Sequence, residues 1–194
     1  MSVVLGVDSS LTISGCALVR FGDGPDAADP VWETWRGRTV AAEVETVETL
    51  RRRIRVMLRE ILAIVPPRLT LSVVEGPAMS AKYTPLADER AGLRWMLIDQ
   101  LMARGPVALV SPISRQALSG VGTIPRGTKG PQRKRMVTAA VVQMLPGVHV
   151  PDHNVADAVA LAAAGAHRVG LRMPYSVKQE KAHANVAWPV ESVA

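Results

Sequence analysis

The stretch Val3-Val4-Leu5-Gly6-Val7-Asp8-Ser9-Ser10 opens the chain with an apolar run that ends at an acidic residue. Because successive positions are apolar, the run is expected to be a central strand, buried on both faces. Glu75 ends a similar run, Leu71-Ser72-Val73-Val74, and Asp157 lies in an alanine-rich segment. A carboxylate at the end of a buried strand is costly to hold there unless something binds it. The three residues are therefore candidate ligands of a divalent metal ion.

Each acidic residue also has an ordinary interpretation. An Asp that ends a strand is often a turn former or a helix cap, and Glu75 precedes Gly76-Pro77, which a plain turn would explain. Asp157 is harder to explain this way, because it shares a small, apolar helix face with Ala160 and Ala164. Neither Lys nor Arg lies one turn away on that face, so a partner for Asp157 has to come from elsewhere.

The remaining hydrophobic pattern predicts an α/β fold with a mixed five-stranded sheet. Strands joined by short turns are antiparallel, whereas strands reached through helices are parallel to the first. The first three strands should therefore be antiparallel and the later ones parallel, with helices on both faces. The expected strands are 3–8, 14–20, 31–38, 69–75 and 107–110, and the expected helices are 43–65, 84–104, 114–118, 131–145 and 154–172.

Length and composition bound the domain organisation. The 194 residues fit one domain, 1–172, followed by a polar tail, 173–194, which is expected to be irregular or laid over the body as a strap. The lone Cys16 excludes an internal disulfide and fits a reducing compartment. The chain has neither an apolar run long enough to span a membrane nor the charged start of a signal peptide, so the cytoplasm is expected.

The charge of the chain indicates an anionic partner. The net charge is +6 and the pI is about 10.1. Residues 100–151 contain glycines and no acidic residue, and their basic residues are Arg104, Arg115, Arg126, Lys129, Arg133, Lys134 and Arg135. Such a segment suits a phosphate backbone, although a mobile surface loop would have the same composition. A second basic run, Arg51-Arg52-Arg53, is expected to lie on a solvated helix face, with a DNA contact as the alternative.

Together, three carboxylates and a basic segment favour metal-dependent hydrolysis of phosphodiester bonds. Two magnesium ions can activate the attacking water and stabilise the leaving oxygen. Hard oxygen ligands select Mg²⁺ or Mn²⁺, and no zinc motif is present among the single cysteine and the scattered histidines.

As a set, these motifs resemble the RuvC-like Holliday-junction resolvases, which have the ribonuclease H-like fold. Leu5 to Ser10 followed by Ser14-Gly15-Cys16-Ala17 is similar to the opening hairpin of that family, and Val73 to Pro77 to its second acidic strand end. Ala156-Asp157-Ala158 is similar to its closing helix. The resemblance covers about residues 3 to 170. The forms Glu75-Gly76-Pro77 and Asp152-His153-Asn154 are more similar to the versions of actinobacterial phages.

The resemblance implies a structure-selective endodeoxyribonuclease that cuts four-way DNA junctions symmetrically, as a homodimer, with two Mg²⁺ ions that Mn²⁺ can replace. It places Arg115 and Lys134 at two phosphate-facing positions, with Lys129, Arg126 and Arg133 as further DNA contacts. The loop after Glu75, which carries Lys82 and Tyr83, would enter the junction. That loop lacks the aromatic residue expected near Ala78, so the preference for a cleavage sequence is open.

A further departure from the family lies at the start of the last helix. The register of a fourth acidic residue falls on Asn154, with His153 beside it. Both precede Asp157 by about one turn, so His153 is a candidate metal ligand or proton carrier, and Asn154 a candidate ligand. Alternatively, Asp152 or Asn154 caps the helix and His153 is merely exposed.

Helix 84–104 is expected to form the dimer contact, because it has more apolar surface than one core face needs. Its apolar residues include Leu93, Trp95, Met96, Leu97, Ile98 and Leu101.

Three other functions are compatible with parts of the sequence. They are a related nuclease for flaps, forks or RNA–DNA hybrids, a DNA-binding module without catalysis, and a sugar-kinase-like ATPase. Retention of all three acidic residues disfavours the second. The absence of a second glycine-rich phosphate loop from the sequence disfavours the third.

Overall fold

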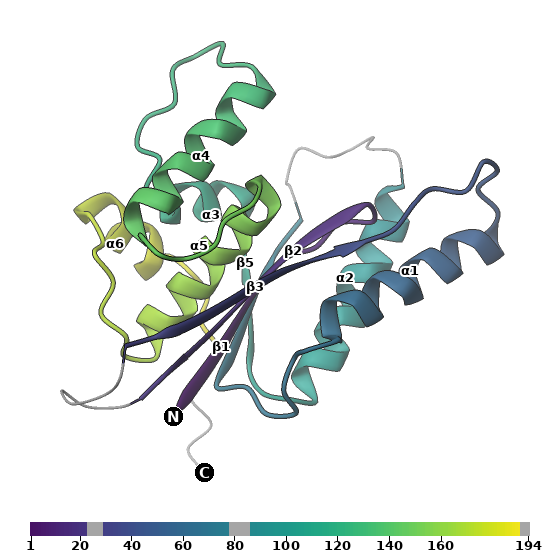
Figure 1. Ribbon diagram of the computed structural model, residues 1–194, viewed down its shortest axis with the longest axis horizontal. Coiled ribbons are helices and arrows are strands. Elements are labelled where there is room, and N and C mark those ends of the chain that lie inside the picture. Colours follow the sequence, from purple (N-terminus) through teal and green to yellow (C-terminus); the bar gives the residue numbers. More distant parts are fainter. Residues whose placement is uncertain (23–28, 78–85, 191–194) are drawn as a thin grey trace.

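A five-stranded mixed sheet forms the centre of the protein (Figure 1). The computed structural model describes residues 1–22, 29–77 and 86–190. The strands lie in the order β3-β2-β1-β4-β5. Strand β1 is antiparallel to β2, β2 is antiparallel to β3, and β4 is parallel to both β1 and β5. This arrangement confirms the predicted sheet. The strands are β1 (Ser2–Asp8), β2 (Ile13–Phe21), β3 (Val31–Arg38), β4 (Leu71–Glu75) and β5 (Val107–Val110).

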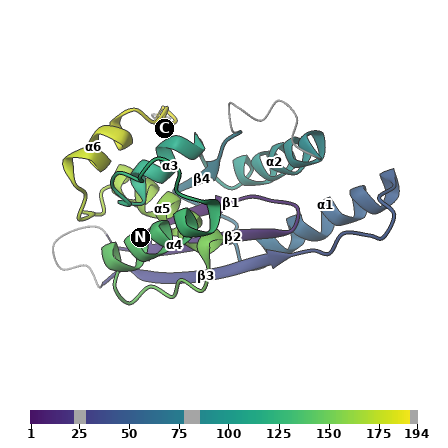
Figure 2. The same cartoon turned by 90° about the horizontal axis from the view of Figure 1, so that it is seen from above.

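Helices cover both faces of the sheet, as predicted. On one face lie α1 (Val47–Leu62) and α2 (Ala87–Met102). On the other face α5 (His153–Arg168) packs directly on the sheet. Around α5 lie the helices α3 (Pro112–Leu118), α4 (Gly130–Met144) and α6 (Val177–Ala184). Figure 1 shows the sheet between the two groups of helices, and Figure 2, seen from above, shows α3 to α6 on the left and α1 and α2 on the right.

The alternation of side chains along the strands decides which face each strand-ending carboxylate meets. In β1, Leu5 and Val7 belong to the core beneath α1 and α2, whereas Val4 belongs to the core beneath α5. Because neighbouring strand residues point to opposite faces, Asp8 lies on the α5 side. In β4, Val74 faces α1 and α2 and Val73 faces α5, so Glu75 also lies on the α5 side.

Helix α5 lies close to the sheet, because two glycines leave room for its backbone. A Cβ atom at Gly6 would come within 2.2 Å of the Ala158 carbonyl oxygen, and one at Gly15 within 1.9 Å of the Asn154 carbonyl oxygen. Any larger residue at either position would push the helix away from β1 and β2. The alanines of α5 complete this contact, and all residues from Val155 to Ala166 are buried.

The start of α1 corrects the interpretation of the basic run at residues 51–53. Arg51 and Arg52 are exposed, as expected, but Arg53 is 8% exposed. Its guanidinium donates hydrogen bonds to the carbonyl oxygen of Leu11 at 3.1 Å, to the Thr12 hydroxyl at 3.0 Å and to the Glu45 carboxylate at 2.8 Å. Buried polar groups are normally paired in this way, and Arg53 thereby fixes the β1–β2 turn to α1.

The tail contains regular structure that was not expected from its polar sequence. Residues 177–184 form α6, which begins with a capping box between Ser176 and Gln179. The Gln179 side chain is buried and donates to the Leu118 carbonyl oxygen at 2.9 Å, so it joins α6 to α3. This hydrogen bond attaches the helix of the tail to the body of the protein. Among the residues that the structure describes, no helix is long and apolar enough to cross a membrane.

Candidate active site

Asp8 and Glu75 lie side by side at the same edge of the sheet. Strands β1 and β4 are parallel neighbours in which Val7 pairs with Val74, so the next residue of each strand is a carboxylate. Both side chains lie on the α5 face. Asp8 is 8% exposed, and the Glu75 side chain is 16% exposed.

Asp157 reaches the same place from α5. It is the fifth residue of the helix and is buried on the side that packs on the sheet. The close approach of α5 at Gly6 and Gly15 brings its first turns over the ends of β1 and β2. The three acidic residues singled out from the sequence are thus gathered by three different elements.

Arg115 holds two of these carboxylates together. It lies on α3, whose start is capped by the Ser111 hydroxyl. Its Nε donates to Glu75 Oε1 at 2.9 Å, and its Nη1 donates to Asp157 Oδ1. The arginine side chain is itself 16% exposed. The partner that Asp157 requires therefore comes from α3, far away in the sequence, and not from its own helix.

The electrostatics of the cluster favour cation binding. Burial raises the pKa of Asp8 well above its usual value, and the neighbouring carboxylates of Glu75 and Asp157 raise it further. Burial also raises the pKa of Asp157 to about 7, against the lowering effect of Arg115. Burial lowers the pKa of Arg115, but the three carboxylates outweigh it, so the net shift is upward. Carboxylates that ionise reluctantly next to one another bind a divalent cation favourably.

The donor set fits magnesium or manganese. Asp8, Glu75 and Asp157 offer only carboxylate oxygens, which are hard ligands, and two of them already converge on one guanidinium. A cation bound here would compete with the Arg115 guanidinium for Glu75 and Asp157. It would either take over the role of the guanidinium charge or move the guanidinium away from the carboxylates.

A cavity of about 320 Å³ adjoins Asp157 and Arg115. It is also lined by His153, Lys134 and Arg133, so it brings together five of the residues selected from the sequence. Lys134, Arg133, Lys129 and Arg126 are all exposed, on α4 or just before it. Lys82 and Tyr83 lie outside the described residues. The cavity also includes Gln116 and the exposed Ile113, which lie on the same helix as Arg115 and were not predicted.

The sequence left open which residue caps the start of α5, and the structure shows that it is Asp152. Asp152 is the N-cap and accepts hydrogen bonds from the backbone N–H groups of Asn154 and Val155, both at 3.0 Å. Arg36 pairs with the same Asp152 carboxylate at 2.9 Å. His153 is half-buried, lines the cavity with Asp157, and has a pKa lowered by burial and by Lys134. Asp152 is therefore the helix cap, as the alternative interpretation expected, and a role for the His153 ring in the cavity stays a prediction.

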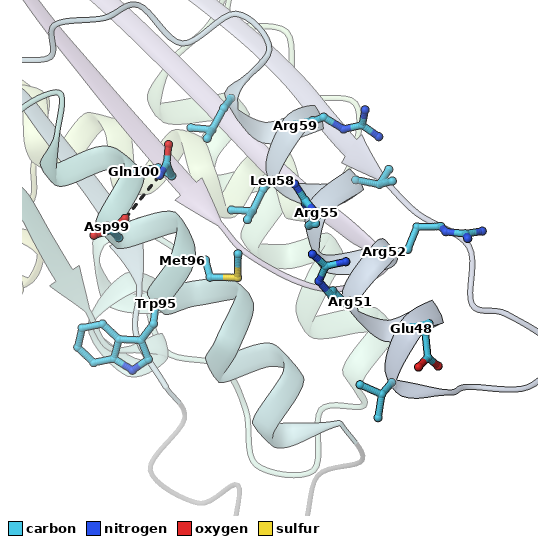
Figure 3. A pocket seen from close by; sticks show the side chains of 13 residues that line it. Glu48, Arg51, Arg52, Arg55, Leu58, Arg59, Trp95, Met96, Asp99 and Gln100 are labelled. Atoms are coloured by element: carbon cyan, nitrogen blue, oxygen red, sulfur yellow. Dashed lines mark hydrogen bonds between the residues drawn. The ribbon is translucent and has the colours of Figure 1, made fainter.

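A larger cavity of about 1250 Å³ lies elsewhere, between α1 and α2 (Figure 3). Arg51, Arg52, Arg55 and Arg59 line it from α1, and Trp95, Met96 and Asp99 line it from α2. None of the clustered carboxylates belongs to it, so its size does not make it the catalytic cleft.

Solved structures of other proteins have the same fold. The sequence matches no protein-family model and none of the curated proteins with which it was compared. The chain is similar to the RuvC structure of Thermus thermophilus, with 22% identity and a TM-score of 0.53 over 89% of this chain and 99% of that one. The same values of identity and TM-score hold for T. thermophilus RuvC in complex with a Holliday junction substrate, over 90% of this chain and 100% of that one.

A viral structure gives a similar result. The fowlpox virus resolvase, in complex with Holliday junction DNA, matches with 9% identity and a TM-score of 0.52, over 87% of this chain and 99% of that one. At these identities the likeness concerns the arrangement of the chain. The chain therefore has the ribonuclease H-like fold of the RuvC-like resolvases, as the resemblance in its motifs implied.

Proposed function

We propose that the chain is a metal-dependent endodeoxyribonuclease that resolves four-way DNA junctions. The observation that carries this proposal is the convergence of Asp8, Glu75 and Asp157 at one edge of the sheet, beside Arg115 and a basic cavity. The likeness to resolvases solved with Holliday junctions supports junction DNA as the substrate.

The three carboxylates would hold Mg²⁺, with Mn²⁺ as a substitute. Two such ions, when bound, supply a water activated for attack and charge stabilisation for the leaving oxygen. The protein's own contribution is to orient this chemistry. Asp8 and Glu75 are fixed by paired strands, and Asp157 by a buried helix, so their positions are set before DNA binds.

Basic residues around the cavity would hold the DNA backbone. Lys134 and Arg133 line the cavity from α4, and Lys129 and Arg126 precede them on the exposed loop. Arg115 would pair with carboxylates in the metal-free protein and with a phosphate once metal has neutralised them. His153, whose lowered pKa keeps its imidazole neutral at pH 7, would accept a proton or act as a further ligand, with Asn154 beside it.

We also propose that the protein acts as a homodimer, since two symmetric cuts call for two active sites. The surface available for this contact is smaller than the sequence suggested. Leu93, Leu97, Ile98 and Leu101 are buried in the core, so α2 exposes mainly Trp95, Met96 and Met102. Trp95 is 62% exposed and borders the groove shared with α1 (Figure 3). Such an exposed aromatic is a suitable centre for an interface between two copies.

The proposal is tested by incubating the protein with labelled four-way junction, flap, fork, RNA–DNA hybrid and linear duplex, in Mg²⁺ or in EDTA. We expect paired nicks in the junction that depend on the metal. Preferential cutting of flaps, forks or hybrids would instead establish the related-nuclease alternative. Junction binding without cutting in either Mg²⁺ or Mn²⁺ would establish a non-catalytic binding protein.

A further inference from the structure

A cluster of two histidines and a glutamate joins the end of α5 to α6, outside the candidate active site. His167 comes from the last turn of α5, and Glu180 and His183 come from α6. The ligand atoms of these three side chains lie within 4.8 Å of one another. Glu180 and His183 are three residues apart on one helix, so they lie on the same face.

The hydrogen bonds of His167 leave its second ring nitrogen facing an anion. Its Nδ1 lies 3.3 Å from the Leu171 carbonyl oxygen, which only accepts, so Nδ1 carries the proton of a neutral ring. Its Nε2 lies 3.2 Å from Glu180 Oε2. The lone pair of His167 Nε2 would then face the Glu180 carboxylate, which is unfavourable unless a second proton or a cation lies between the two groups.

The hydrogen bond of His183 likewise selects one tautomer. Its Nε2 lies 3.1 Å from the Ala164 carbonyl oxygen, so Nε2 is the donor and Nδ1 keeps its lone pair. Burial lowers the pKa of His183. Histidines that bind metals commonly donate their other N–H to a backbone carbonyl in this manner, which fixes the ring. Both histidines of the cluster have such a carbonyl partner.

The surroundings of the cluster are aromatic and contain a polar atom without a partner. The rings of Tyr175 and His167 have centroids 4.9 Å apart, and those of Trp188 and His183 4.8 Å apart. The Tyr175 hydroxyl is buried and makes no hydrogen bond within the described structure. Burial and then the charge of Glu180 raise the pKa of Tyr175. Buried hydroxyls are usually paired, and a water bound to a cation beside Glu180 would be a suitable partner.

We propose that His167, Glu180 and His183 form a binding site for a borderline divalent cation, such as Zn²⁺, which fastens α6 to α5. The ligands would be His167 Nε2, His183 Nδ1 and the Glu180 carboxylate, with water in the fourth position. Ligand atoms about 2.1 Å from a tetrahedral zinc ion are about 3.4 Å from one another. The ligand atoms of the cluster lie within 4.8 Å of one another, so they have to move slightly closer together. Glu180 is the exposed member and has room to move inward.

This site differs in chemistry from the candidate active site. Two imidazoles favour zinc and its neighbours, whereas three carboxylates favour magnesium. Its role would be structural, since it lies where the tail is fixed to the body through Gln179 and Leu118. It depends on none of the residues proposed to cut DNA, so either proposal can fail without the other.

The test is equilibrium dialysis of the full chain, stripped of metal, against Zn²⁺. Millimolar Mg²⁺ is present throughout, so that it occupies the carboxylates of the candidate active site. We expect one zinc ion per chain for the wild type and for His149→Ala, which removes an exposed histidine outside the cluster. Glu180→Gln keeps the size of an exposed side chain, and His183→Ala removes a ring nitrogen. Each should weaken zinc binding by at least about 100-fold, the upper end of the loss caused by changes in outer-shell groups.

Thermal unfolding provides the second measurement. Zinc should raise the unfolding temperature of the wild type and of His149→Ala, and not that of Glu180→Gln. The proposal is overturned if the wild type retains no zinc in Mg²⁺, in which case His167 and Glu180 form an ordinary ion pair. It is also overturned if Glu180→Gln and His183→Ala both bind zinc as tightly as the wild type.

Discussion

Replacing Arg115 with alanine should destabilise the metal-free protein strongly at neutral pH. The guanidinium pairs with Glu75 and Asp157, and all three side chains are 16% exposed or less. Removing one member of such a buried set leaves uncompensated charge, which costs about 3–5 kcal/mol in free energy of unfolding. The remaining carboxylates would respond by holding protons, so the loss should shrink as the pH is lowered toward 5.

The assay is urea unfolding in EDTA at pH 7.5, with Arg135→Ala as the matched control. Arg135 is an exposed basic residue of α4, and its removal should change the unfolding free energy by no more than about 0.5 kcal/mol. Mg²⁺ should then stabilise Arg115→Ala more than the wild type, because no guanidinium competes with the ion for Glu75 and Asp157. A loss below about 1 kcal/mol in EDTA, or equal stabilisation of both proteins by Mg²⁺, would refute this account of the cluster.

Three other predictions concern the same site. Asp157 has a pKa of about 7 in the folded protein and an ordinary value when unfolded. The native state therefore binds more protons between these values, and metal-free stability should fall by about 4 kcal/mol as the pH rises from about 4 to about 7. Asp157→Asn should remove this part of the decrease in urea titrations and leave the contribution of Asp8, whose pKa is also raised, whereas an unchanged slope would place the titration elsewhere. Lys134→Ala should weaken junction binding and reduce the slope of log K against log salt by about one unit, whereas an unaltered slope would exclude a phosphate contact. His153→Ala should lose most Mg²⁺-dependent cleavage and His153→Asp should regain part of it, whereas wild-type rates for His153→Ala with both Mg²⁺ and Mn²⁺ would remove His153 from the chemistry.

The sheet was predictable because local patterns specify it. The expected strands 31–38 and 107–110 have the bounds of β3 and β5. Pro30 and Pro106 directly precede them and Pro112 follows the second, and proline cannot donate a ladder hydrogen bond. The closing helix was predicted to continue to position 172, but it ends at Arg168. Gly170 has a φ of +108°, which stops the helix at a point that hydrophobic periodicity alone does not mark.

The partners of charged residues were less predictable, because they depend on contacts between distant segments. Nothing local distinguishes Arg53 from its exposed neighbours, yet its pairing with the Leu11–Thr12 turn places it in the interior. Arg115 pairs with two carboxylates 40 and 42 positions away, and no local pattern indicates this contact. In the polar tail, the local indication of the histidine–glutamate cluster is the three-residue spacing of Glu180 and His183. This spacing becomes informative only together with His167, which lies in another helix.

The most direct test of the proposed function is cleavage of a four-way junction that carries its label on each strand in turn. Wild type, Asp8→Asn and Glu43→Gln are compared in Mg²⁺. Asp8 is a member of the buried cluster, whereas Glu43 is an exposed carboxylate outside it. The account predicts paired nicks in two opposite strands for the wild type and for Glu43→Gln, and junction binding without nicks for Asp8→Asn. Equal cleavage by Asp8→Asn, or no cleavage by the wild type in Mg²⁺ or Mn²⁺, would contradict it.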